Sequence, residues 1–299
     1  MKTISAVLIV KNEEVLLARC LESVKEADEI IICDTGSTDS TIEIAKKYTD
    51  KIYTDFTWCD SFEKARNHAK SKATKDWILS VDADEVCHDF LKVREAIELA
   101  KDCVGVHLHG EHGKATFRCP RLFRNTPDIR WFGAIHNHIG VTPEGDAKGM
   151  NVSGEGEFVG NVEITYGYSP AHEKDPGRSL RILEREAQDP TKVREMYYLG
   201  RELWYKGRYL EATKWFGKHV LATNFTAEKA DSFLTMSRCY STLGMDDDAR
   251  DACAQAIILN PYFKEAVLFM AAISKDGNSA PWKHMADAAD NRNILFVRT

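Results

Sequence analysis

The sequence predicts an α/β domain with a mainly parallel sheet at residues 1–169, followed by an all-α domain at residues 170–299. In the first half, short apolar runs alternate with segments of helical periodicity, which is typical of a parallel sheet covered by helices on both faces. In the second half, helical periodicity continues almost to the end, and a residue pattern recurs at an offset of 37. Tyr166-Gly-Tyr-Ser-Pro170 and Asp175-Pro-Gly177 interrupt both patterns, so we place the domain boundary near residue 170.

The first half contains four apolar runs that predict strands, with helical patterns between them. The strands are expected at residues 4–10, 29–33, 51–54 and 77–81, and the helices at 13–25, 41–48 and 61–73. Asp39 or Ser40 can cap the second of these helices. A further strand is expected at residues 158–165, at an edge of the sheet.

Acidic residues follow two of the predicted strands. The run from Trp77 to Val81 leads directly into Asp82, Asp84 and Glu85, and Asp34 ends the second strand. Carboxyl ends of parallel strands share one edge of a sheet, where open α/β sheets bind ligands, so we expect these acids to converge. Clustered carboxylates suit a hard divalent cation such as Mg²⁺ or Mn²⁺. The alternatives are a solvated acidic turn after the fourth strand and a plain turn with a helix cap at residues 34–40.

Composition places the chain among globular proteins of two domains. It has 299 residues, 43% of them hydrophobic and 29% charged, and a net charge of -6. No block of Lys and Arg stands out, so composition does not point to nucleic acid. The eight cysteines form no C-x-x-C pair, which argues against structural zinc and favours a reducing cytoplasm. The apolar start breaks at Lys11, too early for a signal peptide, and no stretch is long enough to serve as a membrane anchor.

Several segments of the first half resemble family-2 glycosyltransferases with the GT-A fold, in order and spacing as well as in motif. They are Ala6-Val-Leu-Ile-Val-Lys-Asn-Glu-Glu14, Ile31-Ile-Cys-Asp-Thr-Gly-Ser-Thr-Asp39, Trp58-Cys-Asp-Ser-Phe-Glu-Lys-Ala-Arg-Asn67, Asp82-Ala-Asp-Glu85, Pro120-Arg-Leu-Phe-Arg-Asn125 and Phe132-Gly-Ala-Ile-His136. With the helical tail, the chain most resembles the subgroup that fuses this domain to tetratricopeptide-like helices. The resemblance implies a GT-A nucleotide-sugar-binding domain, a UDP-sugar donor and transfer with inversion.

The resemblance also implies roles for individual residues. The acid matching Asp34 hydrogen-bonds the nucleobase of the donor. Asp82 and Asp84 match the DXD motif, in which the first acid faces the ribose and the second binds the metal, Mn²⁺ or Mg²⁺, which neutralises the diphosphate. His136 matches a further metal ligand, although a His beside Ile135 is also typical of an ordinary half-buried residue.

Basic and polar residues of two further motifs are implied to bind the donor. Arg66 and Asn67 are expected to line the donor site near the base or diphosphate, and Arg121 and Arg124 to approach the diphosphate or an acceptor. The alternative for Arg66 is a surface position on an amphipathic helix. Asn137 stands where the family frequently has Glu, which leaves the general base unassigned.

We expect the catalytic group to comprise Asp82, Asp84 and Glu85. An inverting transfer needs a general base, and the sequence does not choose among the available acids, which are Glu85, Asp60, Glu111, Asp146, Glu155 and Glu157. Residues 145–160, rich in Gly, Asn, Ser and Glu, predict a loop that could close over the donor or serve as a connector.

The second half predicts two to three helical repeats. Gly207, Ala212 and Phe216 recur as Gly244, Ala249 and Cys253, and a third, degenerate unit opens at residue 263. A turn glycine followed by a small residue is the tetratricopeptide pattern, although its usual period is about 34 residues. Such an array could bind the acceptor, form a homodimer or brace the first domain. Residues 293–299 are apolar for a tail and are expected to dock.

The function expected from these features is metal-dependent transfer of a sugar from a nucleotide-sugar to an acceptor. The acceptor could be a peptide or protein, a saccharide, or a modified nucleobase in DNA, which the acidic net charge does not support. The alternative is a non-catalytic helical-repeat adaptor that carries an inactive transferase domain. A dinucleotide-dependent enzyme is disfavoured because Lys11-Asn12-Glu13, rather than a G-x-G-x-x-G turn, follows the first strand.

Overall fold

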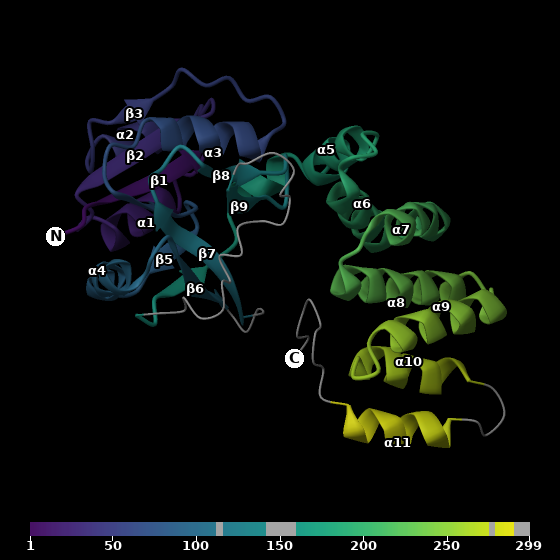
Figure 1. Ribbon diagram of the computed structural model, residues 1–299. Coiled ribbons are helices and arrows are strands. Elements are labelled where there is room, and N and C mark those ends of the chain that lie inside the picture. The colour runs from purple at the N-terminus through teal and green to yellow at the C-terminus, as the bar shows by residue number, and fades with distance from the viewer. Residues whose placement is uncertain (112–115, 142–159, 275–278, 290–299) are drawn as a thin grey trace. The chain divides into compact units, whose positions relative to one another are not determined.

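The computed structural model describes residues 1–111, 116–141, 160–274 and 279–289 (Figure 1). The chain divides into two compact units, Met1–Pro176 and Gly177–Thr299, where the sequence predicts the division between 169 and 170. Each unit has its own hydrophobic core and is described by itself. In the described parts of the chain, no helix has both the length and the apolar content needed to cross a membrane.

In the described residues of the first unit, the main sheet has eight strands. Its strands, in spatial order, are β3 (Ile52–Tyr53), β2 (Glu29–Asp34), β1 (Ile4–Val10), β4 (Trp77–Ser80), β7 (Thr116–Arg124), β6 (Cys103–Gly110), β10 (Glu163–Tyr166) and β5 (Glu85–Cys87). The first four strands pair in parallel, as do β6 and β10. The pairs β4–β7, β6–β7 and β10–β5 are antiparallel. The predicted mainly parallel sheet is therefore confirmed.

Both faces of the sheet are covered, which explains the continuous apolar runs of its central strands. In β1, Ala6 and Leu8 belong to a core cluster that includes residues of α1 (Leu17–Ser23) and α4 (Phe90–Leu99). Val7, between them, belongs to the cluster on the opposite face. That second cluster holds residues of α3 (Phe62–Ser71) and of a two-stranded sheet, β8 (Ile129–Phe132) and β9 (His138–Val141). Side chains of a strand alternate between faces, so each face needs its own apolar set.

Two expectations about the elements need correction. The edge strand predicted at 158–165 is wrong, because β10 begins at Glu163 and lies inside the sheet, between β6 and β5. The edge strand on this side of the sheet is β5, whose three residues are too few for hydrophobic periodicity to reveal it. The first helix is also shorter than the predicted 13–25, because residues 13–16 form a turn in which Glu13 accepts hydrogen bonds from the amides of Leu16 and Leu17. The short helix α2 (Thr41–Ala45) begins after Asp39, whose carboxylate accepts the amide of Thr41 at 3.0 Å.

The second unit consists of helices that pack in succession. They are α5 (Arg178–Glu186), α6 (Val193–Tyr205), α7 (Tyr209–Ala222), α8 (Thr226–Thr242), α9 (Asp246–Leu259), α10 (Lys264–Ile273) and α11 (Ala280–Ala288). The offset of 37 has a structural counterpart: Gly207 and Gly244 turn the chain with φ angles of 73° and 74°. Ala212 and Ala249, five residues later, are completely buried. The predicted all-α domain of repeated helix pairs is confirmed.

Candidate functional site

The four residues Asp82–Glu85, here called the acidic turn, join β4 to β5 at the carboxyl end of β4. The two ends of this turn bind each other. The amide of Glu85 donates to the carbonyl oxygen of Asp82 at 3.0 Å, and the amide of Asp82 donates to Oε2 of Glu85 at 2.9 Å. Glu85 is 3% exposed, whereas Asp84 is half-buried. The reciprocal bonds fix the backbone that carries all three acids.

Two arginines neutralise the acidic turn. Arg66, on α3, donates from Nη2 to Oδ1 of Asp82 at 2.6 Å. Arg121, on β7, donates from Nη2 to Oδ2 of Asp82 at 3.1 Å and forms a short ion pair with Glu85. Arg66 is 8% exposed, and the Nε atoms of both arginines are buried without a hydrogen-bond partner among the described residues. Such unpaired donors are uncommon in a finished core and are consistent with a site that binds oxygen atoms of a ligand.

The electrostatic environment gives the half-buried Asp82 and the buried Glu85 opposite pKa shifts. Burial alone would raise the pKa of Asp82, but Arg66 and Arg121 outweigh it and hold that pKa well below its usual value. For Glu85, burial dominates and raises the pKa to about 7, although Arg121 opposes the shift. Asp82 is therefore a stable anion that orients the two guanidinium groups.

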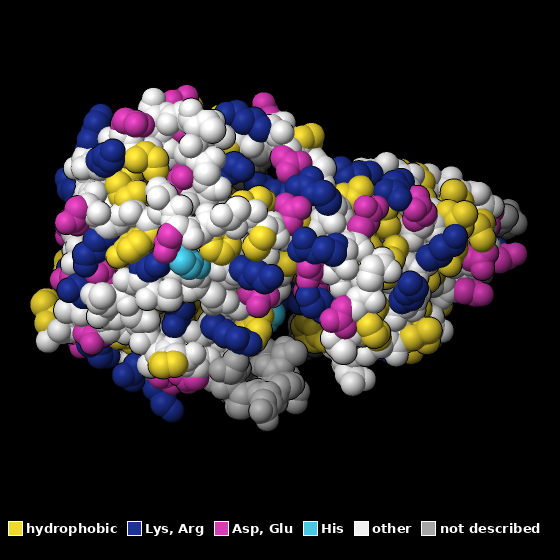
Figure 2. Space-filling view, turned by 90° about the horizontal axis from the view of Figure 1, so that it is seen from above, with side chains coloured by type: hydrophobic (Ala, Val, Ile, Leu, Met, Phe, Trp, Pro, Cys, Tyr) yellow, Lys and Arg dark blue, Asp and Glu magenta, His cyan; other side chains and the backbone are white. Residues whose placement is uncertain are grey.

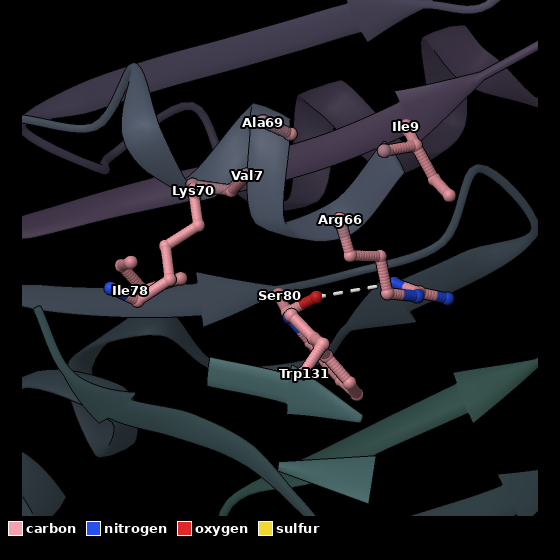
Figure 3. A pocket seen from close by; sticks show the side chains of 8 residues that line it. All are labelled: Val7, Ile9, Arg66, Ala69, Lys70, Ile78, Ser80 and Trp131. Atoms are coloured by element: carbon pink, nitrogen blue, oxygen red, sulfur yellow. Dashed lines mark hydrogen bonds between the residues drawn. The ribbon is translucent and has the colours of Figure 1, made fainter. Parts of the chain in front are cut away.

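The side chain of Arg66 is held on three sides. Its Nη1 donates to Oγ of Ser80 at 3.3 Å, and its Cζ lies 4.8 Å from the ring centroid of Trp131 (Figure 3). Asn67 exchanges two hydrogen bonds of 2.9 Å with the backbone of Trp131. Asn67 thus does not join the acidic turn directly. It fixes the aromatic residue that stacks on Arg66.

Figure 3 shows the small pocket beneath Arg66, between α3 and the sheet. Its other lining residues are mostly apolar, namely Val7, Ile9, Ala69, Lys70, Ile78, Ser80 and Trp131. Because the apolar side chains of this pocket exclude water from Arg66, its positive charge acts strongly on anions that pair with its guanidinium group.

Asp34 lies on the same edge of the sheet, at the end of β2. In the parallel register of β1 and β2 it is opposite Val10. Its carboxylate is buried and accepts the amides of Gly36 and Ser37, each at 3.0 Å. Gly36 has a φ of 110°, a conformation that favours glycine. Asp34 therefore shapes the loop that follows β2.

Glu13 is a residue of this edge to which the sequence alone gave no role. Its Oε2 accepts the hydroxyl of Ser169 at 2.6 Å. Burial, together with the nearby charges of Asp84, Asp82 and Asp39, raises the pKa of Glu13 to about 7, although the hydrogen bond from Ser169 opposes the shift. The only sequence signal was its place in the Lys11-Asn12-Glu13 motif after the first strand.

The remaining predicted residues are more dispersed. His136 is exposed and has a φ of 48°, in the link between β8 and β9. Arg124 is half exposed and lies 4.0 Å from Asp102, away from the acidic turn. Of the candidates for the general base, Glu111 pairs with Arg19 at 2.7 Å, and Asp60 accepts from the indole of Trp58 at 3.0 Å. Three further candidates, Asp146, Glu155 and Glu157, lie outside the described residues, as does the predicted loop at 145–160 apart from Gly160.

The acidic turn offers carboxylate oxygens of the kind that Mg²⁺ or Mn²⁺ binds. Among the described residues, no three His, Cys, Asp or Glu side chains converge into a metal cage. Asp82 and Glu85 both form ion pairs with arginines. Asp84 is half-buried in the same turn, and its role as a metal ligand stays a prediction. Mg²⁺ commonly binds through one or two carboxylates together with phosphates of a substrate. The residues present therefore fit a cation that arrives with a diphosphate, and a role for His136 stays a prediction.

Residues 5–137 match the family model described as "Glycosyl transferase family 2". A TPR repeat-containing protein of Synechococcus elongatus is 41% identical over 146 residues, which cover 46% of this chain and 36% of that protein. Glycosyltransferase SunS of Bacillus phage SPbeta is 27% identical over 232 residues, 73% of this chain and 53% of that protein. An uncharacterized glycosyltransferase of Rickettsia typhi is 42% identical over 86 residues, 28% of this chain and 29% of that protein. The chain thus spans about half or less of the length of these curated relatives.

Among solved structures, TarS 1-349 of S. aureus in complex with UDP-GlcNAc has a TM-score of 0.46 and 15% identity, covering 97% of this chain and 89% of that one. A TM-score of this size carries no argument about function.

Proposed function

We propose that this chain, whose residues 5–137 match the glycosyl transferase family 2 model, transfers a sugar from a nucleotide-sugar, UDP-linked by preference, to an acceptor. The observation that carries the proposal is the acidic turn. It lies within the matched region at the carboxyl end of a central strand, with Asp82 held between the buried Arg66 and the half-buried Arg121. This is the edge at which open α/β sheets bind ligands.

The proposed roles follow from what each side chain touches. Arg66 and Arg121 present guanidinium groups to the diphosphate, and Asp82 orients them and faces the ribose. Asp34 holds the loop after β2 and receives the nucleobase. Glu85 keeps the turn closed, so Asp82, Asp84 and Glu85 act as one catalytic group.

Asp84, with His136, would hold Mn²⁺ or Mg²⁺, which supplies positive charge where the nucleoside diphosphate leaves. The residues of this chain do the rest. They bind the diphosphate, orient the donor and keep water from the buried arginines. Inversion at the sugar, and the base that takes the acceptor proton, stay predictions.

We propose a peptide, protein or saccharide as the acceptor, bound by the helical unit, in preference to a modified nucleobase in DNA. Figure 2 shows Lys and Arg side chains interspersed with Asp and Glu over the face drawn, and the net charge is -6. A DNA-binding face usually concentrates positive charge. A homodimer through the helical unit, and a cytoplasmic location, stay predictions.

A second candidate function is a non-catalytic adaptor with an inactive transferase domain. It is favoured by Asn137, which stands where the family frequently has Glu and whose side-chain nitrogen has no hydrogen-bond partner among the described residues. An adaptor would bind a partner through the helices and leave nucleotide-sugars intact.

A screen for donor hydrolysis separates the two candidates without knowledge of the acceptor. The protein is incubated with Mn²⁺ and a panel of UDP-, GDP- and CMP-sugars, and release of the free nucleotide is measured. We expect slow hydrolysis of one UDP-sugar, which the variant Asp84→Asn does not perform. Equal nucleotide release by the wild type and by Asp84→Asn would contradict the enzyme proposal.

A further inference from the structure

We infer that Glu13 and Ser169 form a latch that positions the acidic turn, so that both are positioning residues of the donor site. The expected effect on donor binding rests on the proposed function. The latch itself rests on geometry alone. The two residues are 156 positions apart in the chain, and their side chains meet at 2.6 Å.

Glu13 is rigidly placed by its own backbone. Its carbonyl oxygen accepts the amides of Leu16 at 3.1 Å and Leu17 at 2.9 Å, which opens α1. Its own amide donates to the hydroxyl of Thr41 at 2.7 Å. The side chain of Glu13 therefore extends from a fixed backbone position beside β1. Its hydrogen bond to Ser169 defines the position of Ser169 relative to the central strands of the sheet.

Ser169 uses its hydroxyl fully. The hydroxyl group donates its hydrogen to Glu13, and its oxygen accepts the amide of Ala171 at 3.1 Å at the start of the short 3-10 helix η2 (Pro170–Lys174). Ser169 is 2% exposed. A buried hydroxyl with both a donor and an acceptor role is costly to remove, because its partners then lose their hydrogen bonds inside the protein.

The segment just before Ser169 touches the acidic turn. The amide of Gly167 donates to the carbonyl oxygen of Asp84 at 2.9 Å, and Tyr166 pairs with Glu85 in the β10–β5 ladder. A Cβ atom at Gly167 would lie 3.0 Å from Oε2 of Glu111 and 3.4 Å from the same carbonyl oxygen of Asp84. The segment is thus in close contact with the turn, and we infer that the latch keeps it there.

The chemistry favours a hydrogen bond, not a charge, as the useful property of Glu13. Asp39, Asp82 and Asp84 are all close enough to oppose its ionisation. Burial and these charges disfavour a carboxylate at this position, whereas the hydrogen bond from Ser169 lowers the pKa and opposes them. A glutamine offers the same acceptor oxygen without the charge.

The test uses the full chain, four single variants and the double variant Glu13→Ala/Ser169→Ala. Glu13→Ala and Ser169→Ala remove the latch from either side, Glu13→Gln keeps an acceptor, and Glu14→Gln is the matched control on the neighbouring exposed acid, which accepts the amide of Ser40. The first measurement is hydrogen–deuterium exchange of the peptide that contains Gly167. We expect exchange about tenfold faster in both alanine variants, as for loss of one strong hydrogen bond, and unchanged in both glutamine variants.

The second measurement is the affinity for UDP in the presence of Mn²⁺. We expect it to fall about tenfold in each alanine variant, by no more in the double variant, and by less than about twofold in Glu13→Gln. Unchanged exchange at Gly167 in the alanine variants would overturn the latch, as would a loss in Glu13→Gln as large as in Glu13→Ala. Absence of UDP binding by the wild type would reject the proposed function instead, and the exchange result would still decide the latch.

Discussion

Asp82 and Glu85 each hold the other's backbone: the amide of Glu85 bonds to the carbonyl of Asp82, and the amide of Asp82 bonds to the side chain of Glu85. The same two acids share the guanidinium group of Arg121. One half-buried guanidinium group and two reciprocal hydrogen bonds thus determine the shape of the acidic turn that carries Asp84.

Removal of Glu85 should destabilise the first unit. Glu85→Ala leaves the amide of Asp82 and part of Arg121 without partners inside the protein, and we expect the free energy of unfolding to fall by about 3 kcal/mol. Glu85→Gln keeps an acceptor and should cost less. Urea unfolding measures both, with the exposed Glu95→Ala as the control, expected to change by less than about 0.5 kcal/mol. An equal effect of Glu85→Ala and the control would show that the turn does not depend on Glu85.

Arg66 should act on donor binding through its planar fork. Lysine at this position keeps the positive charge but cannot bond Asp82 and Ser80 together while stacking on Trp131. We expect Arg66→Lys to bind UDP about tenfold more weakly, as for loss of one charge-assisted hydrogen bond, in a titration at constant Mn²⁺. Arg130→Lys, an exposed arginine on β8, is the control. Wild-type affinity in Arg66→Lys would remove Arg66 from the donor site.

Glu29, at the start of β2, should make stability depend on acid. Burial alone would raise its pKa, but Lys51, Ser5 and Thr74 outweigh it and lower the pKa to about 2. A folded-state pKa below the unfolded value gives stability that is present above about pH 4.5 and is lost as the pH falls toward 2. The shift corresponds to about 3 kcal/mol.

Thermal or urea unfolding between pH 6 and pH 2 tests this prediction. We expect Glu29→Gln to be less stable than the wild type at pH 6 and to lose less stability on acidification. Parallel curves for the two proteins would show that Glu29 is not responsible for acid sensitivity in this range.

Two helical glycines should respond oppositely to a methyl group. A Cβ on Gly200, in α6, would lie 2.9 Å from the ring of Phe216, whereas one on Gly217, in α7, meets nothing within 4 Å. We expect Gly200→Ala to destabilise the second unit by about 1–3 kcal/mol. Gly217→Ala should stabilise it by up to about 1 kcal/mol. Melting of both variants by circular dichroism gives the signs, and destabilisation by Gly217→Ala would mean that the two helices pack differently.

The architecture, and the edge of the sheet that carries the site, could be predicted from the sequence. Apolar runs that end in Asp34 and Asp82 place these acids at strand ends, and the parallel alternation places both at one edge. The repeated Gly207 and Gly244 likewise mark the turns of the helical unit. These are local signals, readable from periodicity and turn chemistry.

Contacts between distant segments could not be predicted in the same way. The bond between Glu13 and Ser169, and the sharing of Arg121 between Asp82 and Glu85, depend on how β7 and β10 enter the sheet. Nothing in the three residues of β5 marks them as a strand, so the position of β10 inside the sheet was also missed. Propensity cannot resolve such short elements, because tertiary pairing decides them.

We propose that the acidic turn binds a nucleoside diphosphate together with a divalent cation. Calorimetric titration of UDP with and without Mn²⁺ tests this site most directly. We expect the wild type to bind UDP at least about tenfold more tightly with Mn²⁺ than without it, and Asp84→Asn to bind equally weakly under both conditions. UDP affinity that does not depend on Mn²⁺ in the wild type, or that keeps its Mn²⁺ dependence in Asp84→Asn, would contradict the account.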